Sequence, residues 1–363
     1  MNVRPYLFRL LFLVLSASAL AVPASPQAQG FAGLGTQAEG FAVPERGVPL
    51  VFPRDHGAHP DYRIEWWYLT ANLKSSDGRS FGLQWTLFRS ALEPGGKDAS
   101  QIWMGHAAVT SAERHLVAER LARGGTGQAG VTLEPFSAWI DEWKMESRVS
   151  EEALAAGADP LTKLALGASG KDFRYAMELE AKGPLVLQGD HGYSVKSAEG
   201  QASYYYSQPF YTISGTLVLP DGEVAVTGEA WLDREWSSQP LSAGQTGWDW
   251  FSLHLGSGEK LMAFRLRGNG EGYISGTWIA ADGQPTPLRS SDLVVTPLDT
   301  ARVAGHTLPV RWRVEVPGHG VDVTTEALNN DAWMAVSFPY WEGPIRVSGS
   351  HKGAGYLEMT GYK

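Results

Sequence analysis

The stretch of sequence that decides the fold runs over residues 65–89 and reads EWWYLTANLKSSDGRSFGLQWTLFR. Two segments rich in aromatic and aliphatic residues, 65–73 and 81–89, stand on either side of Ser76-Asp77-Gly78. Such residues favour strands, and an Asp-Gly turn between two runs of this kind is typical of a β-hairpin. The sequence therefore predicts two antiparallel strands joined by a tight turn.

A second unit of the same kind lies in the last third of the chain. It opens with residues 248–255 (WDWFSLHL), turns at 256–258 (GSG) and returns through 261–265 (LMAFR). Both units open with two tryptophans and close on a Phe-Arg pair. We interpret them as copies of one sheet module, one in each of two domains.

The rest of the chain is also dominated by short strand-like runs. Further strands are expected at 102–110, 173–180, 209–219, 223–232, 274–280, 310–316 and 321–326. A helix is expected only at 150–157, between a capping Ser150 and Gly157. Strands this short and regularly spaced predict an all-β chain of barrels or sandwiches. The strand pattern breaks near 237–240, so we expect an N-terminal domain over 48–236 and a C-terminal domain over 237–363.

The beginning of the chain is typical of an export signal. Arg4 and Arg9 precede the apolar run 10–15, and Ala19-Leu20-Ala21 resembles a cleavage site. We expect a signal peptide at 1–21, a flexible segment at 22–47, and a periplasmic or secreted protein without a membrane span after cleavage. The sequence contains no cysteine, which excludes a lipoprotein anchor, disulfides and thiolate metal ligands.

The composition restricts the classes of partner that the protein can bind. The net charge of −9 gives the chain no bulk attraction for nucleic acid. The 14 tryptophans among 363 residues indicate either an aromatic β core or a cavity lined for an apolar ligand. The residue pattern leaves both interpretations open.

Several long motifs carry a resemblance to a known family. They are 52–59 (FPRDHGAH) followed by 65–68 (EWWY), 228–237 (GEAWLDREWS), 340–343 (YWEG) and 355–362 (GYLEMTGY). Together they resemble the AttH-like proteins, which share a domain with the carotenoid 1,2-hydratases (hydroxyneurosporene synthases) and include predicted secreted hydrolases.

The resemblance implies two lipocalin-like (calycin) antiparallel β-barrel domains and an apolar, isoprenoid- or lipid-like small molecule as ligand. It also implies an ABC transporter permease complex as a partner. No cofactor is implied.

The segment around Asp233 offers the first candidate chemistry. Alternation along a strand places Trp231, Asp233 and Glu235 on one face, with Arg234 and Trp236 on the other. Two neighbouring carboxyls raise each other's pKa, which suits a general acid that protonates an alkene.

The alternative interpretation is structural. Asp233 and Glu235 would then pair with Arg234, Arg265 or Arg267 at the mouth of the sheet. The matching segment of the hydratases reads Asp-His-x-Trp, whereas this chain has Arg234 at the His position. Arginine does not donate protons near neutral pH, so the role of that His does not carry over.

A second group of candidates precedes the first strand. Asp55, His56, His59, Asp61 and Glu65 include a His-x-x-His spacing, but it lies in a stretch rich in Gly and Pro, and we expect no metal. His59 is either a third catalytic candidate or, with Asp55, a residue that pins a loop across the barrel mouth.

Ligand contacts are assigned to the aromatic residues and one histidine of the strand motifs. These are Trp66, Trp67, Tyr68, Trp85, Tyr205, Trp231, Trp236, Trp250 and His254. A Ser-His-Asp triad is not expected from Ser252, His254 and Asp249, since Asp249 falls on the opposite strand face.

Three functions follow from these expectations, and the altered hydratase motif at Arg234 favours the first, an exported carrier of an apolar small molecule, over an enzyme that uses Asp233 as its acid. A carrier needs an aromatic cavity without a buried acid in catalytic geometry. A hydratase or hydrolase needs Asp233 or Glu235 desolvated inside the cavity. A protein-interaction module needs barrels filled by their own side chains and an exposed ring-rich face.

Overall fold

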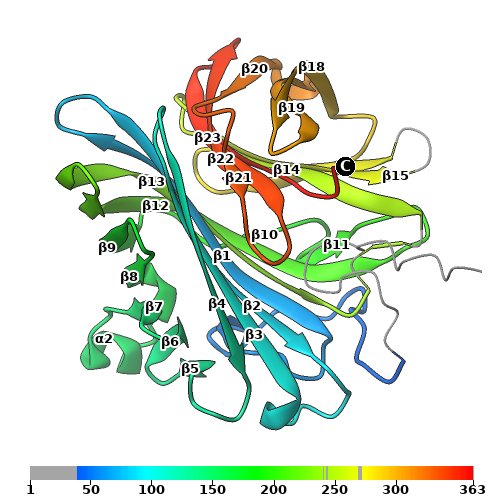
Figure 1. The fold of residues 1–363 in the computed structure, drawn as a ribbon. Coiled ribbons are helices and arrows are strands. Elements are labelled where there is room, and N and C mark those ends of the chain that lie inside the picture. Colours follow the sequence, from blue (N-terminus) through cyan, green and yellow to red (C-terminus); the bar gives the residue numbers. More distant parts are fainter. Residues whose placement is uncertain (1–38, 240, 243, 269–271, 363) are drawn as a thin grey trace, which may run out of the picture.

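The structure, a computed structural model, describes residues 39–239, 241–242, 244–268 and 272–362. The expected signal peptide, and the part of the expected flexible segment up to residue 38, lie outside the described residues. The described chain is almost entirely β, and it forms two curled antiparallel sheets (Figure 1). The prediction of an all-β, lipocalin-like fold is confirmed, with one sheet curled into a barrel and the other into a half-barrel.

The first sheet forms the barrel. Its strands are β1 (Ile64–Ser75), β2 (Ser80–Ala91), β3 (Gln101–Thr110), β4 (His115–Arg123), β5 (Ala129–Leu133), β6 (Phe136–Ile140), β7 (Trp143–Ser147), β8 (Lys163–Ser169), β9 (Arg174–Ala181), β10 (Val186–Leu187), β11 (Tyr193–Val195), β12 (Ala202–Leu219) and β13 (Gly222–Ser237). They follow the order β4-β3-β2-β1-β13-β12-β9-β8-β7-β6-β5, with β10 and β11 beside β12.

The second sheet forms the half-barrel. Its strands are β14 (Gln245–Leu255), β15 (Lys260–Gly268), β16 (Tyr273–Ile279), β17 (Pro285–Leu288), β18 (Val294–Val303), β19 (His306–Val316), β20 (Val321–Ala327), β21 (Trp333–Met334), β22 (Tyr340–Gly349) and β23 (Gly353–Met359). Their order is β17-β16-β15-β14-β23-β22-β20-β19-β18, with β21 beside β22.

Both expected hairpins are present and occupy the same place in their sheets. Strand β1 pairs with β2 on one side and with the last strand of its sheet, β13, on the other. Strand β14 likewise pairs with β15 and with the last strand of its own sheet, β23. The shared arrangement agrees with a duplicated module.

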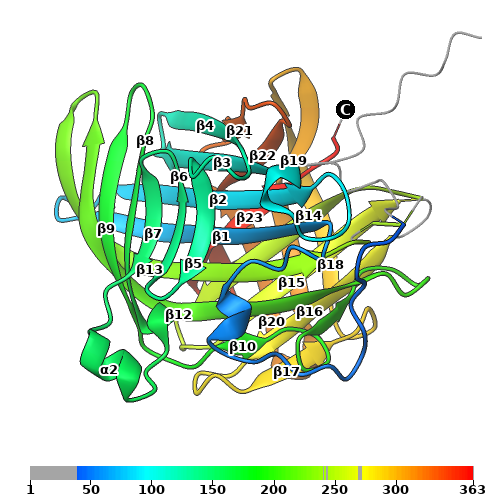
Figure 2. The same cartoon turned by 90° about the horizontal axis from the view of Figure 1, so that it is seen from below.

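Short helical elements are few. They are the helix α2 (Glu151–Ala155) and the 3-10 turns η1 (Arg54–His56), η2 (Asp98–Ser100), η3 (Pro160–Thr162) and η4 (Pro317–His319). The predicted cap of α2 is confirmed, because the Ser150 side chain accepts a hydrogen bond from the Ala153 amide. The helix lies at the outer edge of the barrel, remote from the half-barrel (Figure 2). No helix in the described part of the chain is long and apolar enough to cross a membrane.

Large side chains fill both curled sheets. The interior of the barrel holds Trp67, Trp85 and Trp143, all without solvent exposure, and the half-barrel holds Trp312 and Trp341. A third apolar cluster lies between the two sheets and is built from Tyr68, Tyr205, Trp231, Trp250, Phe264 and their neighbours. The junction of the sheets, rather than the barrel interior, is therefore where a ligand can be sought.

Candidate functional site

Strand β13 presents two different faces. As the alternation predicts, Leu232 and Trp236 belong to the barrel core, whereas Trp231 belongs to the cluster between the sheets. Asp233 and Glu235 lie on the same face as Trp231 and line a pocket there. One strand thus supplies apolar side chains to the barrel core and two carboxyl groups to the junction between the sheets.

The pocket lies between the sheets and has a volume of about 80 Å³. Strands β1, β12 and β13 form one wall, and β14, β15 and β23 form the other. Its lining residues are Trp66, Tyr68, Phe88, Lys196, Tyr205, Asp233, Glu235, Leu241, Trp248, Trp250, Phe264, Leu266 and Glu358. The volume suits a small apolar group, or one end of a longer molecule, more than a whole polyene.

Asp233 sits in this wall as a carboxyl with three donors. Tyr205 donates to Oδ2 at 2.6 Å, while Ser207 and the Trp231 indole donate to Oδ1 at 2.5 and 2.6 Å. Burial nevertheless raises the pKa of Asp233 to about 7, because desolvation outweighs these hydrogen bonds. The group can therefore both take and give a proton near neutral pH.

Glu235 is held differently. Its Oε1 lies 2.8 Å from the Nζ atom of Lys196, and both side chains are buried. The ammonium also lies over the rings of Tyr205 and Phe264, 4.7 and 4.4 Å from their centroids. The ion pair places an ammonium and a carboxylate side by side against the aromatic wall, with the ammonium over two rings.

The structural interpretation of the two acids is corrected by these contacts. Asp233 binds neutral donors and Glu235 binds Lys196, so neither pairs with Arg234, Arg265 or Arg267. Arg234 points to the other face of β13, which removes it from both carboxyls.

Two further acids complete the site, and sequence reasoning assigned them no role. The Trp248 indole donates to Glu358 Oε1 at 2.5 Å, and Tyr68 donates to Glu342 Oε1 at 2.5 Å. Burial raises the pKa of Glu358 to about 8 and that of Glu342 well above its usual range. Glu358 and Glu342 belong to the family motifs at 355–362 and 340–343. Their place in these motifs was the sequence signal that could have identified them.

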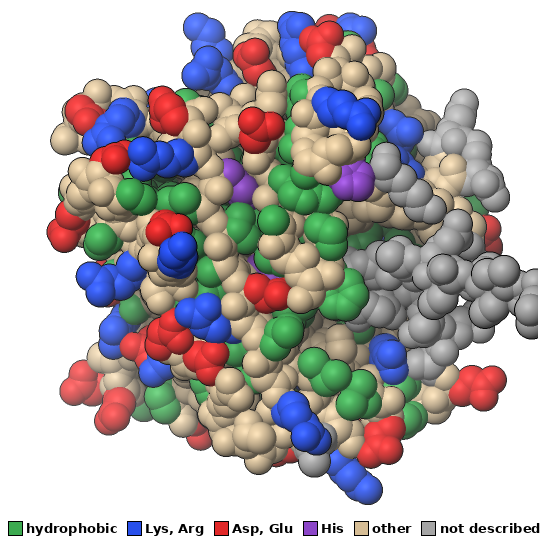
Figure 3. Space-filling model, viewed as in Figure 1, with side chains coloured by type: hydrophobic (Ala, Val, Ile, Leu, Met, Phe, Trp, Pro, Cys, Tyr) green, Lys and Arg blue, Asp and Glu red, His purple; other side chains and the backbone are tan. Residues whose placement is uncertain are grey.

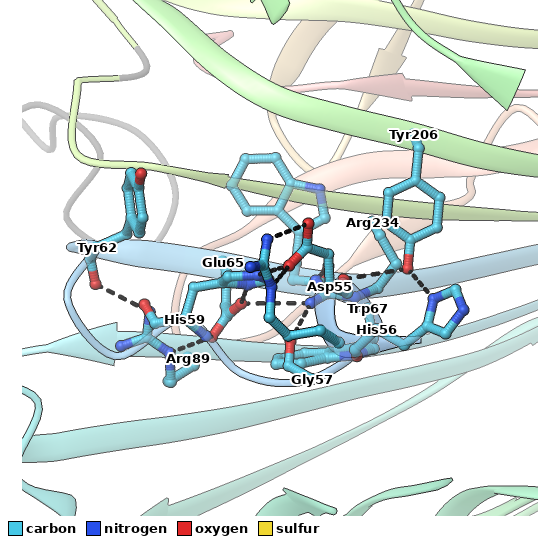
Figure 4. A network of polar contacts seen from close by, with 12 residues as sticks. Asp55, His56, Gly57, His59, Tyr62, Glu65, Trp67, Arg89, Tyr206 and Arg234 are labelled. Carbon is cyan, nitrogen blue, oxygen red and sulfur yellow. Dashed lines mark hydrogen bonds and ion pairs between the residues drawn. The ribbon is translucent and has the colours of Figure 1, made fainter. Parts of the chain in front are cut away.

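His59 lies in a separate network of polar contacts with Asp55, Glu65, Arg89 and Arg234 (Figure 4). Its ring stacks on Trp236 at 3.9 Å between centroids, and its Nδ1 lies 3.0 Å from Glu65 Oε2. Glu65 also binds Arg89 at 2.5 Å and Arg234 at 3.3 Å. His59 is not among the residues that line the pocket.

Arg234 is the centre of that network. Its guanidinium lies 3.8 Å from the centroid of the Trp67 ring and donates to the carbonyls of Gly57 and Trp66 at 2.7 Å each. Both the Arg234 and the Glu65 side chains have no solvent exposure. The network fastens the segment before β1 across the barrel mouth.

The predicted ligand residues divide into three groups. Trp66, Tyr68, Tyr205 and Trp250 line the pocket. Trp67, Trp85 and Trp236 lie inside the barrel. Trp231 and His254 lie together in the junction but outside the pocket lining, with ring centroids 5.7 Å apart.

Comparisons with known proteins agree with this architecture. A family model described as AttH-like matches residues 43–362. A crystal structure of an AttH protein from Nitrosomonas europaea is 31% identical, with a TM-score of 0.77, and the match covers 89% of this chain and 100% of that one. No curated protein matches.

Two more distant structures share the fold. Kievitone hydratase from Nectria haematococca is 17% identical, with a TM-score of 0.65, over 90% of this chain and 98% of that one. A structure of CghA with Sch210972 is 12% identical, with a TM-score of 0.52, over 91% and 97% of the two chains. At these identities the likeness supports the fold and leaves the chemistry to be argued from the pocket.

Proposed function

The chain belongs to the AttH-like family, and from that premise we propose that it binds an unsaturated, isoprenoid- or lipid-like small molecule in the pocket between its sheets and adds water to it. The observation that carries the proposal is the pair of buried acids with raised pKa values, Asp233 and Glu358, in a pocket wall that is mostly aromatic and aliphatic. An apolar lining holds an apolar ligand, and acids with raised pKa values supply proton transfer.

The two acids suit complementary steps. Glu358, with a pKa of about 8, carries its proton at neutral pH and can give it to one carbon of a double bond. The resulting cation is stabilised by the faces of Trp66 and Trp250. Asp233, poised by its three donors, takes the proton that an incoming water loses as its oxygen bonds to the cation. One water is added and the two acids have exchanged protonation states.

A pure carrier is the weaker alternative. A carrier needs the aromatic cavity but no desolvated acid within it, whereas three carboxyls line this pocket: Asp233, Glu235 and Glu358. A site outside the cytoplasm and service to an ABC exporter remain proposals that rest on the N-terminal sequence and the family resemblance.

An interaction module has less support still. Among the described residues, Phe338 is the only aromatic residue in the set of exposed large hydrophobic side chains, so no ring-rich outer face is present there. Figure 3 shows hydrophobic side chains along the middle of one face, interrupted by acidic and polar groups. Scattered exposure of this kind is ordinary for a protein surface.

The binding half of the proposal is tested by extraction. The chain from residue 22 onward is purified, extracted with organic solvent and examined by mass spectrometry for a co-purifying lipid or isoprenoid. Leu266→Trp should fill the pocket and abolish the co-purified molecule. Leu121→Trp, at a side chain that is 55% exposed, is the matched control and should retain it. An empty extract from the parent chain, with no thermal shift on adding geraniol, would count against binding.

The chemical half is tested with the recovered molecule in ¹⁸O-labelled water. The parent chain should add labelled oxygen, and Glu358→Gln and Asp233→Asn should each lower the rate by about 10²–10⁴-fold while retaining the ligand. Retained ligand with no label incorporated by the parent chain would instead identify a carrier.

A further inference from the structure

A chain of two hydrogen bonds crosses from the half-barrel to the barrel and ends on Asp233. The Trp250 indole on β14 donates to the Tyr205 hydroxyl on β12 at 3.1 Å, and that hydroxyl donates to Asp233 Oδ2 on β13 at 2.6 Å. All three residues are buried, with exposed fractions of 8%, 1% and 3%. A residue of one sheet thus reaches, through a single phenol, the acid carried by the other sheet.

The direction of the chain follows from its first member. An indole N–H can only donate, and a buried donor without an acceptor is costly. The Tyr205 oxygen accepts this hydrogen, so the phenol keeps its own proton for the Asp233 carboxylate. The Trp250 ring is oriented by Tyr68, which it meets edge to face with centroids 5.2 Å apart. The geometry therefore directs both hydrogens of the chain toward Asp233.

Strand β14 touches a second donor to Asp233. His254 shares a strand face with Trp250, and its ring lies against that of Trp231 with centroids 5.7 Å apart. The Trp231 indole donates to Asp233 Oδ1 at 2.6 Å. Ser207, the third donor, belongs to the barrel strand β12. Two of the three donors to Asp233 are thus in contact with one strand of the half-barrel.

The hydrogen bond from Trp250 makes Tyr205 a stronger donor. Burial and the charges of Asp233 and Glu235 raise the pKa of Tyr205 well above its usual range, whereas the bond from Trp250 lowers it. Hydrogen bonds in series polarise one another, and the strengthening is about 10–30% per bond. Loss of the first bond should therefore weaken the second, which stabilises the ionised form of Asp233.

Three other charged groups share the pocket with Asp233. Glu235 lies on the same strand, and its charge adds to burial in raising the pKa of Asp233. Lys196 pairs with Glu235 at 2.8 Å and lies over the Tyr205 ring. Glu358 on β23 lines the opposite wall. All three groups stay in place when the Trp250 N–H is removed, so their effect on Asp233 is common to the variants compared below.

We propose that Trp250 is a positioning residue that acts through Tyr205 on Asp233, so that seating the half-barrel on the barrel prepares this acid for proton transfer. The inference deepens the proposed function and rests on it for the use to which the proton is put. The hydrogen-bond coupling itself needs no ligand. Trp250 then has two roles: its ring lines the pocket, and its N–H fixes a donor to Asp233.

A double-mutant cycle tests the coupling, with the pKa of Asp233 as its readout. A ¹³C NMR titration follows the carboxyl carbon, which is assigned by its loss in Asp233→Asn. Tyr205→Phe removes a hydrogen bond to the carboxylate and should raise the pKa of Asp233 by about one unit. Trp250→Phe keeps an aromatic ring but lacks the N–H, and it should raise this pKa by about 0.1–0.3 unit. Added to Tyr205→Phe, the same substitution should cause no further rise, because the link is gone.

Trp312→Phe is the matched control. Trp312 is a buried tryptophan of the half-barrel whose indole donates to the Pro309 carbonyl. The substitution should loosen the half-barrel core and leave the pKa of Asp233 unchanged. Trp250→benzothienylalanine, which has sulfur in place of the N–H in a ring of the same shape, supplies the measurement if Trp250→Phe fails to fold.

Two results would overturn the coupling. One is an unchanged pKa of Asp233 when the Trp250 N–H is removed. The other is an equal shift with and without the Tyr205 hydroxyl, which would show that water enters the pocket rather than that a hydrogen bond is lost. A parent chain that adds no ¹⁸O would overturn the proposed function and leave the cycle intact, since the titration needs no ligand.

Discussion

Glu342 on β22 and Glu358 on β23 stand directly opposite each other in the antiparallel ladder, and both are buried. Two like-charged side chains in this relation repel each other if both are ionised. Burial and mutual repulsion therefore favour the protonated forms, which is the reverse of what most surface carboxyls experience. The pair lies where the half-barrel meets the barrel, so its protonation affects the junction.

Stability should consequently fall as the pH rises. The folded pKa values of Asp233 and Glu358, about 7 and about 8, exceed the ordinary values of 3.8 and 4.5 for these side chains, so the folded state binds more protons between those limits. The free energy of unfolding then decreases as pH climbs through that window. We expect a higher thermal midpoint at about pH 5 than at about pH 9.

Glu358→Gln should flatten this decline by removing one titrating group. Glu180→Gln, at an exposed side chain, is the control and should leave the slope unchanged. Differential scanning calorimetry across the pH range measures both. Equal slopes in the parent and Glu358→Gln would contradict the raised pKa of Glu358.

Arg234 should be indispensable to the barrel. Arg234→Met leaves Glu65 with one guanidinium fewer and removes the donors to two buried carbonyls. Breaking a buried ion pair in this way costs about 3–5 kcal/mol of unfolding free energy. Arg313→Met breaks an exposed pair with Asp322 and should cost at most about 1 kcal/mol. Urea denaturation measures the unfolding free energy of both variants. A similar small decrease in the two variants would refute the central role of Arg234.

The donors around Asp233 should set its pKa. Ser207→Ala removes one hydrogen bond to the carboxylate and should move the pKa of Asp233 upward from about 7 by about one unit. Ser203 lies on the same strand, and its hydroxyl has no hydrogen-bond partner among the described residues. Ser203→Ala is therefore the control and should leave the pKa of Asp233 unchanged. A ¹³C NMR titration of the carboxyl carbons reports the value. A shift downward would show that the Ser207 hydroxyl does not stabilise the ionised form.

The contact between the sheets should be intolerant of added volume at Gly82. A Cβ there would lie 2.5 Å from the Pro344 side chain, on β22 of the other sheet. We expect Gly82→Ala to cost about 1–3 kcal/mol through overpacking. Gly167→Ala, where the nearest atom would be 3.7 Å away, should be tolerated. Thermal unfolding distinguishes the two variants. If Gly82→Ala lowered stability no more than Gly167→Ala, the two sheets would be able to move apart enough to accommodate the added Cβ.

The fold was largely predictable because its hairpins carry strong local signals. The Asp77-Gly78 turn between two ring-rich runs predicted the β1–β2 hairpin directly, and the expected strands 209–219 and 223–232 cover parts of β12 and β13. Strand β4 was missed because residues 115–123 read HLVAERLAR, a composition rich in helix-forming residues that becomes a strand by pairing with β3. Its conformation is decided by its neighbour rather than by its own residues.

The site was predictable only in part. Alternation on β13 grouped Asp233 with Glu235, and the ring-rich motifs included four pocket residues. Glu358 is more than a hundred residues away, and it reaches the pocket only because β23 closes against β14. Alternation also separates Trp66 from Trp67 without saying which face meets the barrel interior. That assignment requires the packing of the two sheets.

The two faces of β13 can change separately in evolution. Substitutions at Asp233 or Glu235 alter what the junction can do, while Arg234 and Trp236 continue to secure the barrel. A lineage could thus retune or silence the chemistry of this strand and keep its scaffold intact. Members of one family could then share Trp236 and the barrel while acting on unlike molecules.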